Sequence, residues 1–158
     1  MNFPTAFADL MKYEGGYSNH PADRGGETMW GITKEVAVKN GYTGDMSALP
    51  VEIAEAIYVK DYWNPVQADK LPEDLRYAVF DAAVNSGVAQ ATRWLQRACG
   101  VRDDGIVGPQ TIRAANALSS EEIKRKMLAQ RLRFMTSLSN WPSFSRGWAR
   151  RIADLLEK

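Results

Sequence analysis

Apolar side chains recur three or four positions apart along most of the chain, and this spacing predicts a mainly α fold. The first such run begins near Pro4 and ends at Glu14, where the pair Gly15-Gly16 stops the helix. Its inward residues are Phe3, Phe7, Leu10 and Met11. The pattern therefore places Glu14 at the C-terminal end of a helix.

The same spacing predicts further helices, each bounded by a residue that commonly caps or breaks a helix. The longest follows Ser119, which has capping-box spacing with Glu122, and we expect the sequence NWPSF to break it. No alternating apolar run is long enough for a sheet, although a short hairpin after Glu14 is compatible with the sequence. The expected helices are one from Thr33 to Gly41, one opened by Pro50, one ending near Gly87, one ending at Gly100, one over residues 111–118, the long helix after Ser119, and one over residues 145–156.

Length and composition fit a domain that folds alone, because 158 residues with 45% apolar side chains can bury a proper core. No apolar run reaches the roughly 18 residues that a membrane span needs. The N-terminal sequence MNFPTAFADLMKYE lacks the apolar block of an export signal. The single cysteine, Cys99, excludes an internal disulfide and is expected to be a buried small hydrophobe.

Charge is unevenly distributed, since residues 121–158 carry nine basic and four acidic side chains in a chain of net charge +1. Two interpretations stay open. The basic residues form the solvated face of an amphipathic helix, or they face an anionic polymer. The basic residues in question are Lys124, Arg125, Lys126, Arg131 and Arg133.

Carboxylates gather in and before the glycine-rich loop that follows the first helix. A carboxylic acid that donates a proton near neutral pH needs its charged form disfavoured, and the carbonyl end of a helix would do this for Glu14. Asp23 and Glu27 are candidates for a second carboxylate, and Thr28 could hold a water molecule. Two acids across a groove are typical of glycoside hydrolysis, but Glu14 as a solvated helix end explains the same spacing.

Aromatic residues near this loop could pack against sugar rings, although such residues are usually core. They are Tyr17, Trp30, Tyr62 and Trp63. Metal chemistry is disfavoured because a zinc hydrolase needs three protein ligands, and the chain offers only His20 and Cys99 as histidine or cysteine ligands. We therefore expect no metal and no cofactor.

Two long segments resemble a known family. EGGYSNHPADRGGETMWGIT, followed by DYWNPVQADKLPEDLRYAVFDAAVNSG, resembles the EGGY-type N-acetylmuramidases of glycoside hydrolase family 108, which occur in phages, prophages and bacterial genomes. LQRACGVRDDGIVGPQTIRAAN and the residues after it resemble the helical peptidoglycan-binding module of type 3. The resemblance implies a lysozyme-like, two-lobed helical fold with a catalytic part over residues 1–90 and a binding lobe over residues 91–158.

The resemblance also implies roles for individual residues. The glutamate of EGGY, Glu14, would be the general acid that cleaves the β-1,4 bond between N-acetylmuramic acid and N-acetylglucosamine. Asp23 would assist it. Thr28 comes one residue earlier than in related phage lysozymes, so Glu27 competes for its role. Asn85 of FDAAVNSG would bind substrate or water, or merely cap its helix.

The segment FDAAVNSG contains one more candidate. Asp81 could orient the neighbouring Asn85, or it could cap local backbone groups.

The predicted function is that of a peptidoglycan hydrolase, acting as a monomer on glycan strands and on no nucleic acid. A phage or prophage endolysin fits best, made in the bacterial cytoplasm without a signal peptide and reaching the wall or periplasm through a holin or another route. One alternative is a lytic transglycosylase, which cuts the same bond without water. Another is a non-catalytic wall-binding or secretion-accessory protein.

Overall fold

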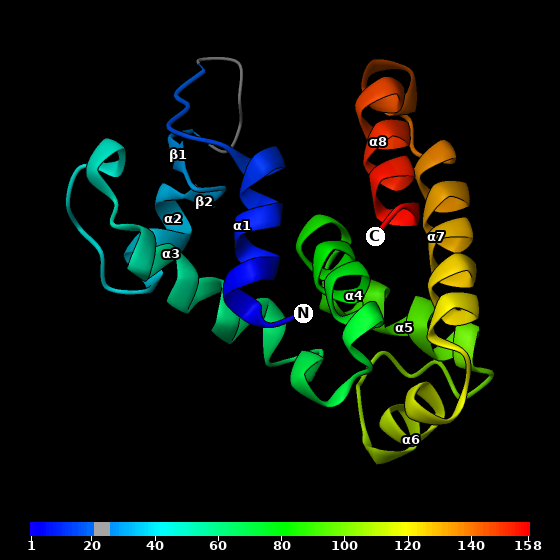
Figure 1. Cartoon of the computed structure of the whole chain (residues 1–158). Helices are drawn as coiled ribbons and strands as arrows, with labels where there is room; N and C mark the ends of the chain where they lie inside the picture. Colours follow the sequence, from blue (N-terminus) through cyan, green and yellow to red (C-terminus); the bar gives the residue numbers. More distant parts are fainter. Residues whose placement is uncertain (21–25) are drawn as a thin grey trace. The chain divides into compact units, whose positions relative to one another are not determined.

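A computed structural model describes residues 1–20 and 26–158, which form a mainly α fold with one short hairpin (Figure 1). The fold class expected from the sequence is therefore confirmed. The chain divides into two compact units, one of residues 3–61 and one of residues 62–158 together with residues 1–2. A functional division at residue 90 stays a prediction.

The first unit carries the hairpin and the shorter helices. Helix α1 packs against α3 through Phe7 and Tyr58, whose rings meet edge to face at 5.4 Å. Thr33 caps α2 as expected, because its hydroxyl accepts a hydrogen bond from the backbone N–H of Val36 at 3.3 Å. The elements are α1 (Phe3–Glu14), β1 (Thr28–Met29), β2 (Ile32–Thr33), α2 (Lys34–Lys39), the 3-10 turn η1 (Met46–Ala48) and α3 (Val51–Tyr58).

The second unit is built from longer helices around an apolar core. Its largest buried side chains include Trp63 and Phe80, whose rings are in edge contact at 5.4 Å. Helix α7 packs against both α4 and α5, and α8 packs against α7. After a π-helical segment, η2 (Val59–Trp63), which bridges the two units in sequence, come η3 (Ala68–Lys70), α4 (Glu73–Ser86), α5 (Val88–Cys99), α6 (Pro109–Ala117), α7 (Ser120–Thr136) and α8 (Trp141–Leu156).

A buried ion-pair cluster joins three helices of this second unit. Arg131 of α7 donates to Asp81 of α4 at 2.6 Å, and Arg151 of α8 donates to the same carboxylate at 2.8 Å. Asp81 is 0% exposed and Arg131 1%. The expectation that Arg131 lies on a solvated helix face is therefore wrong. Within the described residues, Asp81 does not hydrogen-bond to Asn85 or cap local backbone groups as expected; it neutralises two buried cations.

Gln96 of α5 organises the turn-rich segment before α6. Its amide nitrogen donates to the Asp104 carboxylate at 2.8 Å and to the Thr111 hydroxyl at 3.1 Å, and its oxygen accepts from the N–H of Gly105 at 2.9 Å. Helix α5 ends at Cys99, which is buried as expected. Burial raises the pKa of the Cys99 thiol, and the charge of nearby Lys126 opposes this shift.

One helix boundary differs from the expectation. The sequence NWPSF does not separate α7 from α8; instead, α8 begins inside it at Trp141. Pro142 is tolerated there because the N–H that proline lacks would have no helical partner in the first turn. The break lies at residues 137–140, after α7 ends at Thr136. Within residues 1–20 and 26–158, no helix combines the length and apolar character needed to cross a membrane.

Candidate active site

Glu14 is the last residue of α1, as the sequence predicts. Gly15 follows with a positive φ of 34° and donates its N–H to the Met11 carbonyl at 3.3 Å, which ends the helix. Three residues on one face, Ala6, Phe7 and Leu10, are buried and fix α1 on the unit. Glu14 is half-buried at the end of this anchored helix, so the helix fixes the position of its backbone while solvent still reaches the residue.

The turn of the hairpin lies directly against Glu14. A side chain at Gly31 would meet the Tyr58 hydroxyl, and its Cβ would lie 3.1 Å from Cβ and 3.2 Å from Oε2 of Glu14. Gly31 also has a positive φ of 72°. The position therefore needs glycine twice, once for its backbone conformation and once for the close approach of the glutamate.

Trp30 completes this turn and is held by two hydrogen bonds. Its φ is 53°, and with Gly31 it gives the two consecutive positive φ values of a type I′ hairpin turn. Its indole N–H donates to the Leu49 carbonyl at 2.9 Å, and its own carbonyl accepts from the buried Tyr58 hydroxyl at 3.0 Å. The turn beside Glu14 is thus fixed by α3 and by the segment before it. The half-buried indole remains a candidate sugar-binding surface.

Glu27 is held in a separate surface cluster. The Tyr17 hydroxyl donates to its Oε1 at 2.8 Å, and Lys34 Nζ lies 3.4 Å from its Oε2. The hydrogen bond to Glu27 raises the pKa of Tyr17, with burial and the negative charge of Glu27 acting in the same direction. These contacts occupy both carboxylate oxygens of Glu27, which disfavours it as a second catalytic acid. Tyr17 keeps an exposed ring, so its expected contact with substrate stays a prediction.

Thr28 lies on β1, where its backbone N–H and carbonyl pair with Ser18 at 2.8 and 2.9 Å. Its half-buried side chain belongs to the same hairpin as the turn beside Glu14. Asp23, the expected second carboxylate, lies outside the described residues. Tyr62 and Asn85 belong to the second compact unit, Tyr62 half-buried in η2 and Asn85 exposed near the end of α4. Their expected roles at the substrate stay predictions.

Two residues of the site are absent from the sequence-based candidates. They are Gly31 and Tyr58, which shape the turn beside Glu14. The glycine between two short apolar stretches was the available signal, since glycine readily adopts the positive φ that a tight hairpin turn needs. Among the described residues, no group of three or more His, Cys, Asp and Glu side chains could hold a metal ion.

Comparisons with known proteins assign the chain to a family. The family model described as glycosyl hydrolase 108 matches residues 7–87, and a model described as a predicted peptidoglycan domain matches residues 90–153. Among solved structures, SagA of Brucella abortus is 33% identical, with a TM-score of 0.87, over 98% of this chain and 91% of that chain. The comparison with curated proteins gives no match. The chain therefore belongs to the glycosyl hydrolase 108 family and is a glycoside hydrolase that acts on peptidoglycan.

Proposed function

We propose that the chain is an N-acetylmuramidase in which Glu14 is the general acid. The observation that carries this proposal is the seating of Glu14 at the end of α1, where the glycine turn lies against its carboxylate while solvent still reaches it. The backbone of this turn can approach the Glu14 carboxylate closely because Gly31 presents no side chain. The end of α1 and the backbone of the Gly31 turn therefore fix where the carboxylate lies.

In this mechanism Glu14 donates its proton to the glycosidic oxygen between N-acetylmuramic acid and N-acetylglucosamine as that bond breaks. Positive charge then develops at the sugar carbon, and water adds there to give a reducing muramic acid end. We assign to Asp23 the role of positioning this water or stabilising the charge, and this assignment rests on the resemblance of the sequence. Thr28, on the hairpin that carries the Gly31 turn, is the candidate to hold the water.

The test is the substitution Glu14→Gln, which keeps the shape of the side chain and removes the acid. We expect release of reducing ends from purified peptidoglycan to fall at least about a hundredfold, with thermal stability unchanged. The matched control is Glu35→Gln, an exposed glutamate of α2 that pairs with Lys39, and it should retain full activity. Wild-type cleavage by Glu14→Gln would overturn the assignment.

Mass spectrometry of the released fragments defines the bond and the reaction. Hydrated muramic acid ends that vanish in Glu14→Gln would support a muramidase. Ends lighter by one water would identify a lytic transglycosylase. Binding without any fragments would identify a wall-binding or secretion-accessory protein.

We further propose that the protein acts as a monomeric phage or prophage endolysin that reaches the wall from the bacterial cytoplasm through a holin or a comparable route. The resemblance of the sequence to enzymes of this kind supports this setting. Expression in bacteria with and without a holin tests it: rapid lysis only when both proteins are present is the expected result. Lysis that is independent of the holin would point to another export route.

A further inference from the structure

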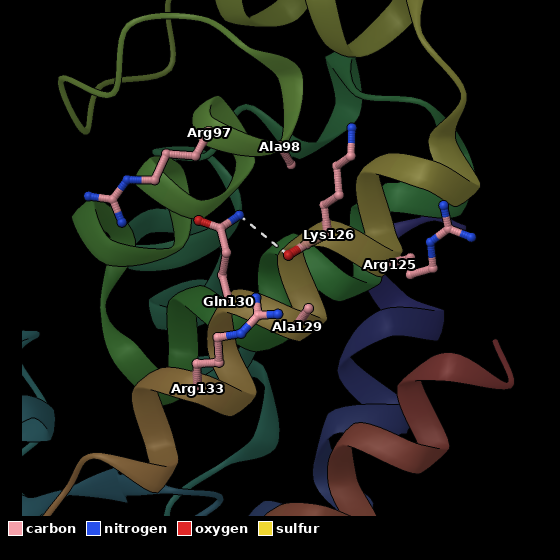
Figure 2. A pocket seen from close by; sticks show the side chains of 7 residues that line it. All are labelled: Arg97, Ala98, Arg125, Lys126, Ala129, Gln130 and Arg133. Carbon is pink, nitrogen blue, oxygen red and sulfur yellow. Dashed lines mark hydrogen bonds between the residues drawn. The ribbon is translucent and has the colours of Figure 1, made fainter.

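A pocket of about 340 Å³ opens between α5 and α7, well away in sequence from Glu14 (Figure 2). Four cationic side chains line it, and the two helices that carry them pack directly against each other. They are Arg97 of α5 and Arg125, Lys126 and Arg133 of α7. This concentration of positive charge selects for an anionic ligand.

Two of these cations already have anionic partners and two do not. Arg97 donates to Asp103 at 2.6 Å, and Lys126 lies 2.7 Å from Glu122. Arg125 and Arg133 form no salt bridge with any residue that the structure describes. Each carries a planar guanidinium, which binds a carboxylate through two parallel hydrogen bonds. The pocket thus keeps a net positive charge and two groups suited to carboxylates.

The uncharged part of the pocket matches a peptide. The amide nitrogen of Gln130 donates to the carbonyl of Trp94 at 3.0 Å and more weakly to that of Lys126 at 3.4 Å, the bond drawn in Figure 2. This fixes the amide and leaves its oxygen with no hydrogen bond to a described residue, as an acceptor for a ligand N–H. Beside it, the methyl groups of Ala98 and Ala129 form a small apolar surface.

We propose that this pocket binds the stem peptide of peptidoglycan. This inference rests on the proposed function, in which the protein acts on peptidoglycan. It assigns the stem peptide, and not the glycan strand, as the ligand of the region that matches the predicted peptidoglycan domain, residues 90–153. Carboxylates of the peptide pair with Arg125 and Arg133. A peptide N–H donates to the oxygen of Gln130, and the methyl group of an alanine packs on Ala98 and Ala129. A lipid phosphodiester would supply the charge but neither the amide N–H nor the methyl group.

The experiment titrates the protein with a free tetrapeptide, L-Ala, D-Glu, diaminopimelate and D-Ala, by calorimetry at low ionic strength. We expect Arg125→Ala/Arg133→Ala to raise the Kd about tenfold or more. The matched control is Arg113→Ala/Arg146→Ala, which removes two exposed arginines of the same unit outside the pocket and should leave the Kd unchanged. Circular dichroism of both variants establishes that they are folded.

Further arms decide the chemistry of the ligand. Amidation of the peptide carboxylates should weaken binding, and so should rising salt, because the contact depends on charge. Equal affinity of the pocket variant and wild type would overturn the proposal. The proposal would also be overturned if wild type bound phosphatidylglycerol vesicles but not the peptide, and the pocket variant lost the vesicle binding. The tetrapeptide contains no glycosidic bond, so Glu14→Gln should bind it with the wild-type Kd. The titration therefore tests the pocket independently of the muramidase assignment.

Discussion

The two compact units place their polar side chains in opposite environments. In the unit that carries the candidate active site, Glu27 accepts a hydrogen bond from Tyr17 and pairs with Lys34 at the surface. In the helical unit, Asp81 and Arg131 bond to each other inside the core. Exposed pairs contribute little to stability, whereas a buried pair makes the helices that carry it depend on each other. The comparison shows that the exposed contacts of Glu27 can be removed at little structural cost, whereas the buried contacts of Asp81 hold α4, α7 and α8 together.

The largest expected effect comes from breaking the buried cluster. Asp81→Ala leaves Arg131 and Arg151 without their shared anion in the core, so we expect the free energy of unfolding to fall by about 3–5 kcal/mol in urea denaturation. The control is Asp103→Ala, which removes an aspartate paired with Arg97 at the surface and should cost far less. Equal losses from the two variants would contradict the contrast between the units.

A smaller loss of stability, with a larger loss of activity, is expected from Gly31→Ala. The new methyl group meets Tyr58 and Glu14, and the alanine must adopt a positive φ. We therefore expect the free energy of unfolding to fall by about 2 kcal/mol and the rate of hydrolysis to fall by more than the loss of folded protein explains. Gly26→Ala is the matched control, because its φ is 65° but nothing lies within 4 Å of the added Cβ. Similar hydrolysis by the two variants would show that the turn does not position Glu14.

Each unit also contains a helix cap of the same geometry, which allows a balanced test. Thr33 caps α2 and Ser119 caps α7, each hydroxyl accepting a backbone N–H at 3.3 Å. Replacing either with alanine should lower the free energy of unfolding by about 1 kcal/mol. Only Thr33→Ala should also slow peptidoglycan hydrolysis, because the cap that it removes anchors α2 to the end of β2, in the hairpin whose turn lies against Glu14. Dye release from labelled peptidoglycan measures this difference.

The smallest effect is a pH dependence in the helical unit. The backbone N–H of Ile106 and the amide of Gln96 hold the pKa of Asp104 below its ordinary value of 3.8. A lowered pKa stabilises the fold above pH 3.8, and this contribution is lost as the pH falls through the folded value. The melting temperature of wild type should therefore fall slightly more between pH 5 and pH 3 than that of Asp104→Ala. An equal fall in melting temperature for the two proteins would show that Asp104 does not contribute to the pH dependence.

Local signals in the sequence predicted most of the fold. Helix ends at Glu14, Gly87 and Gly100, and caps at Thr33 and Ser119, depend on neighbouring residues only, so a single sequence reveals them. The position of Glu14 followed from the same reasoning.

The features that the sequence did not predict depend on distant partners. Arg131 is buried because Asp81, 50 residues earlier, neutralises it, and no periodicity encodes that pairing. The turn beside Glu14 is likewise fixed by Tyr58, 28 residues beyond Trp30. A basic residue on an amphipathic helix is normally solvated, so the pattern favoured exposure for Arg131. Contacts of this range require the folded structure.

The burial of Cys99 has a practical consequence for studying the protein. Its thiol is enclosed at the end of α5 and its raised pKa keeps it protonated at neutral pH, so maleimide reagents will react with it slowly. A cysteine introduced at the exposed position of Arg113 would then be the preferred labelling site without removal of the native thiol. A fluorophore attached there can report wall binding in living cells, with the natural core left intact.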